Sequence, residues 1–298
     1  MPYPFELPFM QRALMAGLVV GVFAPMIGTF LVQRRMSLIG DGIGHVAFAG
    51  VAVGLLLRVS PIWTALAAAV LGALALEWLR ARGRAAGDLA LALIFYSGIA
   101  AGVVLVGLAG SLSANIFSYL FGAILTVDGG ELGVILVLGV AILAVMGAFR
   151  SALFAVAGDE EWARAAGFPV GLLNSMLAVI TAVAIVAAMR VVGILLIAAL
   201  MVLPVASAQL VARSFRGALA WAVGIGVVSV VGGLSAARVL GLVAGGTIVL
   251  VAALVFAVLA VAGRRGVAAP VASGGGWQPA GPAAPVARTD RPDEGSRS

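Results

Sequence analysis

Asp41 and His45 are the two residues of this sequence whose types and spacing could do chemistry inside an apolar segment. They stand four residues apart in the run MSLIGDGIGHVAFAG at 36–50. On a helix, side chains at that spacing share one face, about 5–6 Å apart at Cβ. A carboxylate and an imidazole so placed can bind one divalent cation or pass one proton. Ionisable groups are costly in a hydrocarbon layer, so the pair is a functional hypothesis, with a polar helix-packing pair as the alternative.

The composition indicates a membrane protein. Of the 298 residues, 63% are hydrophobic and 10% are charged, whereas soluble domains carry about 25% charged residues. The formal charge of +6 comes from arginines in short loops, a pattern of membrane orientation rather than of nucleic-acid binding. The absence of cysteine excludes disulfides and thiolate metal sites. The absence of lysine excludes a P-loop ATPase, so ATP-driven transport would need a second polypeptide.

Apolar runs fill most of the chain and predict an all-α bundle. A span needs about 20 mostly apolar residues. Arginines cluster in every second connection between the runs, which places the N-terminus outside and the C-terminus in the cytoplasm. The expected number of spans is about nine, at 11–33, 38–57, 62–79, 88–107, 131–149, 170–189, 191–211, 218–239 and 245–263.

The sequence divides into a transmembrane domain, residues 1–265, and a tail, residues 266–298. The tail is rich in Pro, Gly, Ala and Ser, which cannot bury enough apolar surface to fold, so we expect a disordered cytoplasmic segment. The first apolar run is too long for a cleavable signal and is expected to remain as a span. Residues 111–127 are amphiphilic but too short to cross, which favours a re-entrant or interfacial helix on the outer side.

The connection at 151–169 carries an acidic cluster where arginine would be expected. Asp159 is a predicted N-cap, and Glu160 and Glu161 suit the positive end of a helix dipole. Gly167 is a predicted helix stop. The pattern indicates a cytoplasmic helix of about two turns. It is either a docking element for a partner or a solvated loop with ordinary caps.

The run RRMSLIGDGIGHVAFAGVA at 34–52 resembles the second-span signature of the zinc/manganese permease family of ABC importers. Further runs match that family in order and spacing, and the resemblance covers about residues 10–263. These runs are FSYLFG at 117–122, DEE at 159–161, ARAAG at 163–167, RVVGILL at 190–196, LPVASA at 203–208 and LVARS at 210–214. Asn115 stands where family members often carry Asp, and Gly44 replaces a commoner serine.

This resemblance implies the helical fold of vitamin B12-type importers and a bacterial cytoplasmic membrane. It implies two permease copies forming the pathway, cytoplasmic ATP-binding subunits, and an extracytoplasmic metal-binding protein. Asp41 and His45 match the positions proposed to contact the metal. The segment that matches the family's ATPase-coupling helix contains Asp159, Glu160, Glu161, Ala163, Arg164 and Gly167.

The pair also fits a transported metal on chemical grounds. One Asp and one His are too few for a tight zinc site, whereas the pairs of two copies would supply four ligands. Imidazole suits zinc and manganese better than calcium or magnesium. The residues after His45 resemble zinc-type members, which makes zinc the first candidate and manganese or iron(II) alternatives. A proton-coupled secondary transporter is the competing class. An intramembrane enzyme is not expected, because the single histidine cannot form a His-Glu-x-x-His site and the Gly-x-Ser-x-Gly motif of serine hydrolases is absent.

Overall fold

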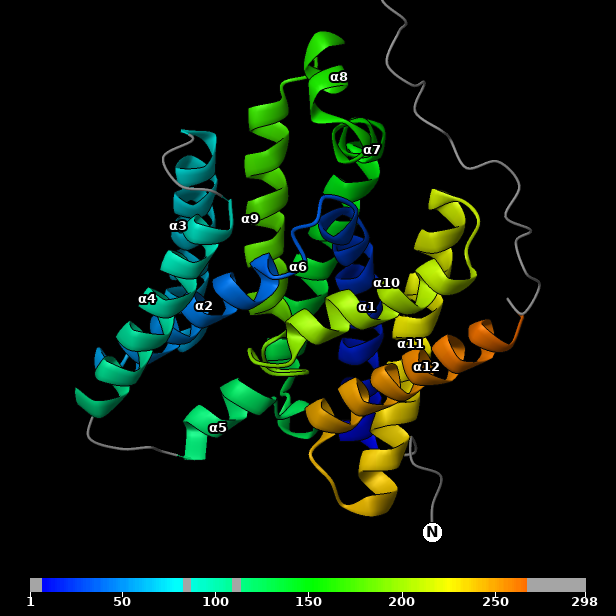
Figure 1. The fold of residues 1–298 in the computed structure, drawn as a ribbon. Helices are drawn as coiled ribbons and strands as arrows, with labels where there is room; N and C mark the ends of the chain where they lie inside the picture. Colours follow the sequence, from blue (N-terminus) through cyan, green and yellow to red (C-terminus); the bar gives the residue numbers. More distant parts are fainter. Residues whose placement is uncertain (1–6, 83–86, 109–113, 267–298) are drawn as a thin grey trace, which may run out of the picture.

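The part of the chain that the structure describes folds into helices without strands (Figure 1). This computed structural model describes residues 7–82, 87–108 and 114–266. The helices are α1 (Pro8–Gln33), α2 (Ile39–Leu56), α3 (Pro61–Ala81), α4 (Gly87–Leu108), α5 (Ala114–Phe121), the 3-10 turn η1 (Ile124–Thr126), α6 (Gly129–Ala148), α7 (Arg150–Gly158), α8 (Glu160–Ala165), α9 (Val170–Ala188), α10 (Ile197–Val211), α11 (Phe215–Leu240) and α12 (Ala244–Gly266).

Eight of the described helices are long and apolar enough to cross a membrane, which confirms the predicted polytopic bundle. They are α1, α2, α3, α4, α6, α9, α11 and α12. The predicted span at 191–211 differs from the observed structure, because α10 has 15 residues and a span needs about 20. The predicted tail falls almost entirely outside the described residues, since α12 ends at Gly266.

The break between α9 and α10 has a local cause. Gly193 adopts φ +96°, a backbone conformation that is strained for other residues. The next two amides pair with another segment instead of with their own helix: Ile194 N–H donates to the Tyr119 carbonyl at 3.0 Å, and Leu195 N–H donates to the Leu120 carbonyl at 3.2 Å. Residues 189–196 therefore form a series of turns, and two of their amides bond to α5, the short helix expected within 111–127.

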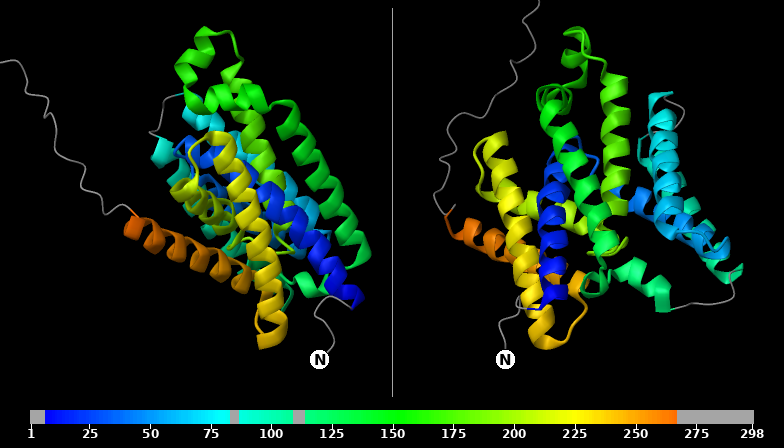
Figure 2. Two further views of the ribbon diagram at one scale, coloured as in Figure 1. Left: turned by 90° about the vertical axis from the view of Figure 1, so that its right-hand side faces the viewer. Right: turned by 180° about the vertical axis from the view of Figure 1, so that it is seen from behind.

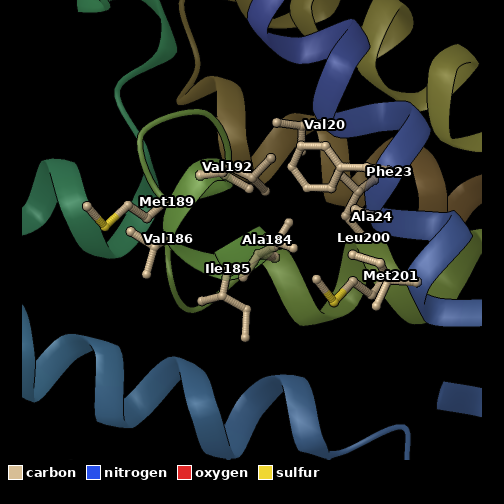
Figure 3. Close-up of a cluster of buried hydrophobic side chains, with 14 of the residues drawn as sticks. Val20, Phe23, Ala24, Ala184, Ile185, Val186, Met189, Val192, Leu200 and Met201 are labelled. Carbon is tan, nitrogen blue, oxygen red and sulfur yellow. The ribbon is translucent and has the colours of Figure 1, made fainter. Parts of the chain in front are cut away.

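The core lies where α1, α9 and α10 meet. In both α1 and α9, 67% of the apolar stretch is buried, against 17% in α4, which is an outer helix. Because lipid is as apolar as these side chains, close packing rather than the hydrophobic effect holds the helices together. The core side chains labelled in Figure 3 are Val20, Phe23, Ala24, Ala184, Ile185, Val186, Met189, Val192, Leu200 and Met201.

The helices α1 and α10 cross at very close range. A Cβ added at Gly28 would lie 1.9 Å from the Met201 carbonyl oxygen, so only glycine allows the two backbones to approach this closely. Pro25 lies one turn earlier in α1, and its carbonyl accepts a hydrogen bond from the Thr29 hydroxyl at 2.8 Å. This crossing fixes α10 beside α1 although α10 is short.

A polar cluster joins α5, α6 and the end of α9. The Arg190 guanidinium donates to the Glu131 carboxylate at 3.2 Å and to the Ser118 hydroxyl at 3.1 Å. The guanidinium also lies 5.2 Å from the centre of the Tyr119 ring. Burial raises the pKa of the Tyr119 phenol, while the nearby positive charge of Arg190 opposes this rise. The cluster holds the turn segment 189–196 at one end of the bundle.

The two ends of the molecule carry different elements. Figures 1 and 2 show α7 and α8 protruding at one end, whereas α5 and the first residues of α1 lie at the other. We call the first of these the α8 end. Figure 1 also shows α2 starting near mid-height and running obliquely, so the first turn of this helix lies within the body of the bundle.

Candidate metal site and coupling helix

Asp41 and His45 lie one turn apart near the start of α2. Asp41 is in the first turn of the helix, and both side chains are half-buried. As their spacing predicts, both side chains line the same cavity. This cavity lies between α2 and α4 and has a volume of about 400 Å³. We call it the α2–α4 cavity. A helix that starts inside a bundle directs its positive dipole end and free amides at the space in front of it, which favours a carboxylate there.

The imidazole of His45 is held by α4. Its ring meets the ring of Phe95 edge-on, with centroids 4.6 Å apart and planes at 78°. Gly98, one turn further along α4, lies so close to α2 that a Cβ on it would be 3.0 Å from the His45 carbonyl carbon. The aromatic contact and the close helix approach restrict the imidazole to the side of α2 that faces the cavity.

The described residues of one chain bring together no three His, Asp or Glu side chains that could hold a metal ion. Asp41 and His45 therefore supply two ligands at most, and four is usual for a structural zinc site. Water, backbone carbonyls or a second copy of the chain must complete the coordination sphere. An incomplete, open site suits a transported ion, which has to leave again.

Two further acidic side chains lie on the helices that pack against α2, and neither was predicted as a site residue. Glu77 of α3 is 8% exposed and pairs with Arg80 at 3.0 Å. Because residues three apart share a helix face, this ion pair within α3 accounts for the buried carboxylate. Asp88, in the first turn of α4, lines the α2–α4 cavity together with Asp41 and His45. No sequence pattern connects Asp88 with the pair, because only the packing of α4 against α2 brings them to one cavity.

The predicted caps of the coupling segment are present in the structure. The Asp159 carboxylate accepts hydrogen bonds from the amides of Glu161 and Trp162 at 2.9 and 3.0 Å. At the other end Gly167 has φ +85°, and the Phe168 amide donates to the Ala163 carbonyl at 3.0 Å. This pattern is a Schellman stop, which requires a left-handed residue at the glycine position. The chain also forms α7 directly before this segment, a helix that the sequence analysis did not predict.

The residues of α8 divide into an inner and an outer side. Ala163 is fully buried in a small apolar cluster with Val156, Val170 and Leu173. Glu161 and Arg164 are exposed, and Trp162 is 60% exposed. An exposed tryptophan beside an acidic side chain at the tip of a protruding helix is available to a partner, whereas Ala163 serves the packing of the segment itself.

Glu160 contacts its own chain. Its carboxylate pairs with the guanidinium of Arg34 and accepts a hydrogen bond from the Asn174 side chain at 3.4 Å. Arg34, whose side chain is 5% exposed, begins the turn that leads into α2. Of the two neighbouring glutamates, Glu160 is therefore engaged within its own chain, whereas Glu161 is exposed. The sequence predicted Arg34 as an orientation signal and as part of the run at 34–52, and nothing in it pairs this arginine with a residue 126 positions away.

Comparison with known proteins agrees with this architecture. A model of the ABC 3 transport family matches residues 6–263. The high-affinity zinc uptake system membrane protein ZnuB of Haemophilus influenzae is 31% identical over 257 residues, 85% of this chain and 96% of that protein. The manganese transport system membrane protein MntC of Halalkalibacterium halodurans is 32% identical over 250 residues, 84% of this chain and 85% of that protein.

A solved structure, PsaBC from Streptococcus pneumoniae in complex with Fab, superposes with a TM-score of 0.77 at 32% identity and covers 85% of this chain and 91% of that one. An inward-facing putative metal-chelate type ABC transporter superposes with a TM-score of 0.64 at 19% identity, which shows a shared fold. The chain therefore belongs to the ABC 3 transport family and is the membrane permease of an ABC metal importer, in which ATP hydrolysis lies in a separate subunit.

Proposed function

We propose that this chain imports a divalent transition-metal ion, with zinc as the first candidate, and that Asp41 and His45 contact the ion on its way. The observation that carries the proposal is the shared cavity: the only histidine of the sequence and a carboxylate one turn away open into the same space between α2 and α4. Manganese is the main alternative, because relatives are named for either metal. Iron(II) fits the same two ligand types.

The proposal includes a second copy of the chain. One copy offers two ligands, and a two-fold pathway would bring two Asp and two His side chains to one ion. The outer face of α4 is apolar and exposed, with Leu89, Leu93, Tyr96, Val103 and Val104 all more than half exposed. Lipid or a second copy would cover such a face.

We assign the two remaining proposed partners to opposite ends of the molecule. A cytoplasmic ATP-binding subunit would seat on α8, and an extracytoplasmic metal-binding protein would deliver the ion at the opposite end, where α5 lies. The N-terminus would then be outside and the C-terminus in the cytoplasm of a bacterial cell. A proton-coupled transporter would use the same Asp–His pair and would leave the capped, protruding α8 without a role.

Transport in proteoliposomes tests the proposed function. The purified permease with its ATP-binding subunit is expected to move zinc only when ATP and the loaded metal-binding protein are both present. The same measurement with manganese decides between the two metals, since the transported ion should be taken up at least about tenfold faster at equal concentration. Zinc movement driven by a pH gradient, without ATP-binding subunits, would instead establish the secondary transporter.

Docking through α8 predicts that its exposed side chains contribute to binding of the ATP-binding subunit. Glu161→Lys combined with Trp162→Ala is expected to weaken binding of the ATP-binding subunit at least about tenfold, because buried tryptophans and charge complementarity dominate such contacts. Glu161→Gln, which keeps the shape and removes the charge, is the matched control and should bind more tightly than the double variant. Pull-down of the ATP-binding subunit gives the readout, and full binding by the double variant would move the docking surface elsewhere.

A further inference from the structure

Asp88 lines two neighbouring cavities beside α2 and α4. One is the α2–α4 cavity, where it faces the same space as Asp41 and His45. The other has a volume of about 140 Å³ and is lined by Asp88 together with Arg34, Arg35 and Arg80. We call this second space the arginine vestibule. Leu91, one turn along α4, also borders both spaces, so the start of α4 separates them and Asp88 stands where they adjoin.

The vestibule leads toward the α8 end. One of its walls is Arg34, and this arginine pairs directly with Glu160 of α8. A route from the Asp41–His45 pair past Asp88 thus runs in the direction of the coupling helix. Under the proposed function this is the cytoplasmic direction, along which an imported ion would leave.

Positive charge in the vestibule would repel a cation unless carboxylates balance it. Arg34 is paired with Glu160 and Arg80 with Glu77, the latter at 3.0 Å. Arg35, whose side chain is exposed, makes no ion pair with a described residue. Asp88 is the one carboxylate among the described residues that line the vestibule, and it forms no ion pair with a described arginine. Its side chain is exposed, so it can face an ion.

We propose that Asp88 is a further metal-contacting residue of this permease, an oxygen ligand that receives the cation from Asp41 and His45 and passes it to the vestibule. The proposal rests on the proposed function. A lone carboxylate with water completing the coordination shell binds weakly, and weak successive sites are what permeation requires. The alternative is that Asp88 only offsets the dipole of α4, in whose first turn it lies.

Uptake rates separate the two roles. In proteoliposomes holding the permease, its ATP-binding subunit and the metal-binding protein, Asp88→Asn is expected to slow zinc uptake about tenfold, whereas Asp88→Glu should retain most of the rate. Asp128→Asn is the matched control: Asp128 caps α6 with its side chain, lies in neither cavity, and asparagine caps equally well. Full-rate uptake by Asp88→Asn would overturn the proposal.

Thiol protection gives a second readout that does not depend on transport rate. The natural chain has no cysteine, so Asp88→Cys introduces a unique thiol at an exposed position. In the complete complex, zinc is expected to slow alkylation of that thiol by a maleimide about tenfold, and adding Asp41→Ala should remove the protection. Asp128→Cys should react equally with and without zinc. Equal alkylation of the Asp88→Cys thiol in both conditions would contradict the proposal.

The outcomes distinguish this proposal from the one on which it rests. If Asp41→Ala abolishes zinc uptake while Asp88→Asn transports normally, only the role of Asp88 is wrong. If the unmodified complex moves neither zinc nor manganese with ATP, the proposed function fails first. Loss of uptake in Asp88→Asn with an unchanged unfolding temperature supports the ligand role. The helix-dipole role alone predicts that this variant unfolds at a lower temperature.

Discussion

Asp41→Ala and His45→Ala are each expected to lower metal uptake at least about 100-fold, because each removes one of the two proposed ligands of the Asp41–His45 pair. Even the loss of a residue that only supports a metal ligand costs about 10–100-fold. The measurement is uptake of radioactive zinc in cells that lack other zinc importers. Both substitutions make α2 more apolar, so insertion of the helix into the membrane should continue normally.

Folding is expected to survive these substitutions. Removing Asp41 loses a favourable charge in the first turn of α2, worth about 0.3–1 kcal/mol. Removing His45 loses the edge-on contact with Phe95, worth about 0.5–1.5 kcal/mol. Asp41→Asn and His45→Gln keep the approximate shape and serve as controls for packing. If either alanine variant takes up zinc at the normal rate, that side chain only packs the helices.

Glu160→Lys is expected to destabilise the protein, in contrast to Glu161→Lys. It places a second positive charge against Arg34, whose side chain is 5% exposed, and removes a charged hydrogen bond worth about 1.5–3 kcal/mol. The turn that leads into α2 should loosen, which lowers both the unfolding temperature and zinc uptake. Thermal unfolding of the detergent-solubilised permease measures the first effect without any partner subunit.

A double-mutant cycle isolates this ion pair. Arg34→Gln and Glu160→Gln should each destabilise the protein, and the double variant should cost less than the sum of the two, because residues in direct contact are coupled. Arg35→Gln, one residue further along and exposed, should leave the unfolding temperature nearly unchanged. Additive effects of Arg34→Gln and Glu160→Gln would show that the two side chains do not interact in solution.

The physical consequence of this ion pair is a short connection from α8 to the candidate metal site. Glu160 lies in the first turn of α8, and Arg34 precedes α2, where Asp41 occupies the first turn. A displacement of α8 by a bound ATP-binding subunit would therefore act on the turn that positions Asp41. The same contact explains why Glu160 is unsuitable as a test of docking and why Glu161 is the informative substitution.

Features that depend on near neighbours in the chain could be predicted from the sequence. Eight of the predicted spans are long apolar helices in the structure. A single segment of about 20 apolar residues in lipid can pair its backbone N–H and C=O groups internally only as a helix. The cap at Asp159 and the stop at Gly167 were predicted because a capping side chain and a left-handed glycine act within one turn. The shared face of Asp41 and His45 follows from the helical repeat alone.

Features that depend on distant contacts were decided by the tertiary structure. Residues 191–196 look like part of a span, yet the amides of Ile194 and Leu195 pair with α5, and Gly193 between the two helices has a left-handed backbone. Two adjacent glutamates have different roles because Arg34 and Asn174 reach only Glu160. Asp88 joins the cavity of Asp41 and His45 because α4 packs along α2. The sequence by itself determined which segments are helical and which side chains could hold a metal, whereas the packing of those helices decided which charges meet, because such contacts join residues far apart in the chain.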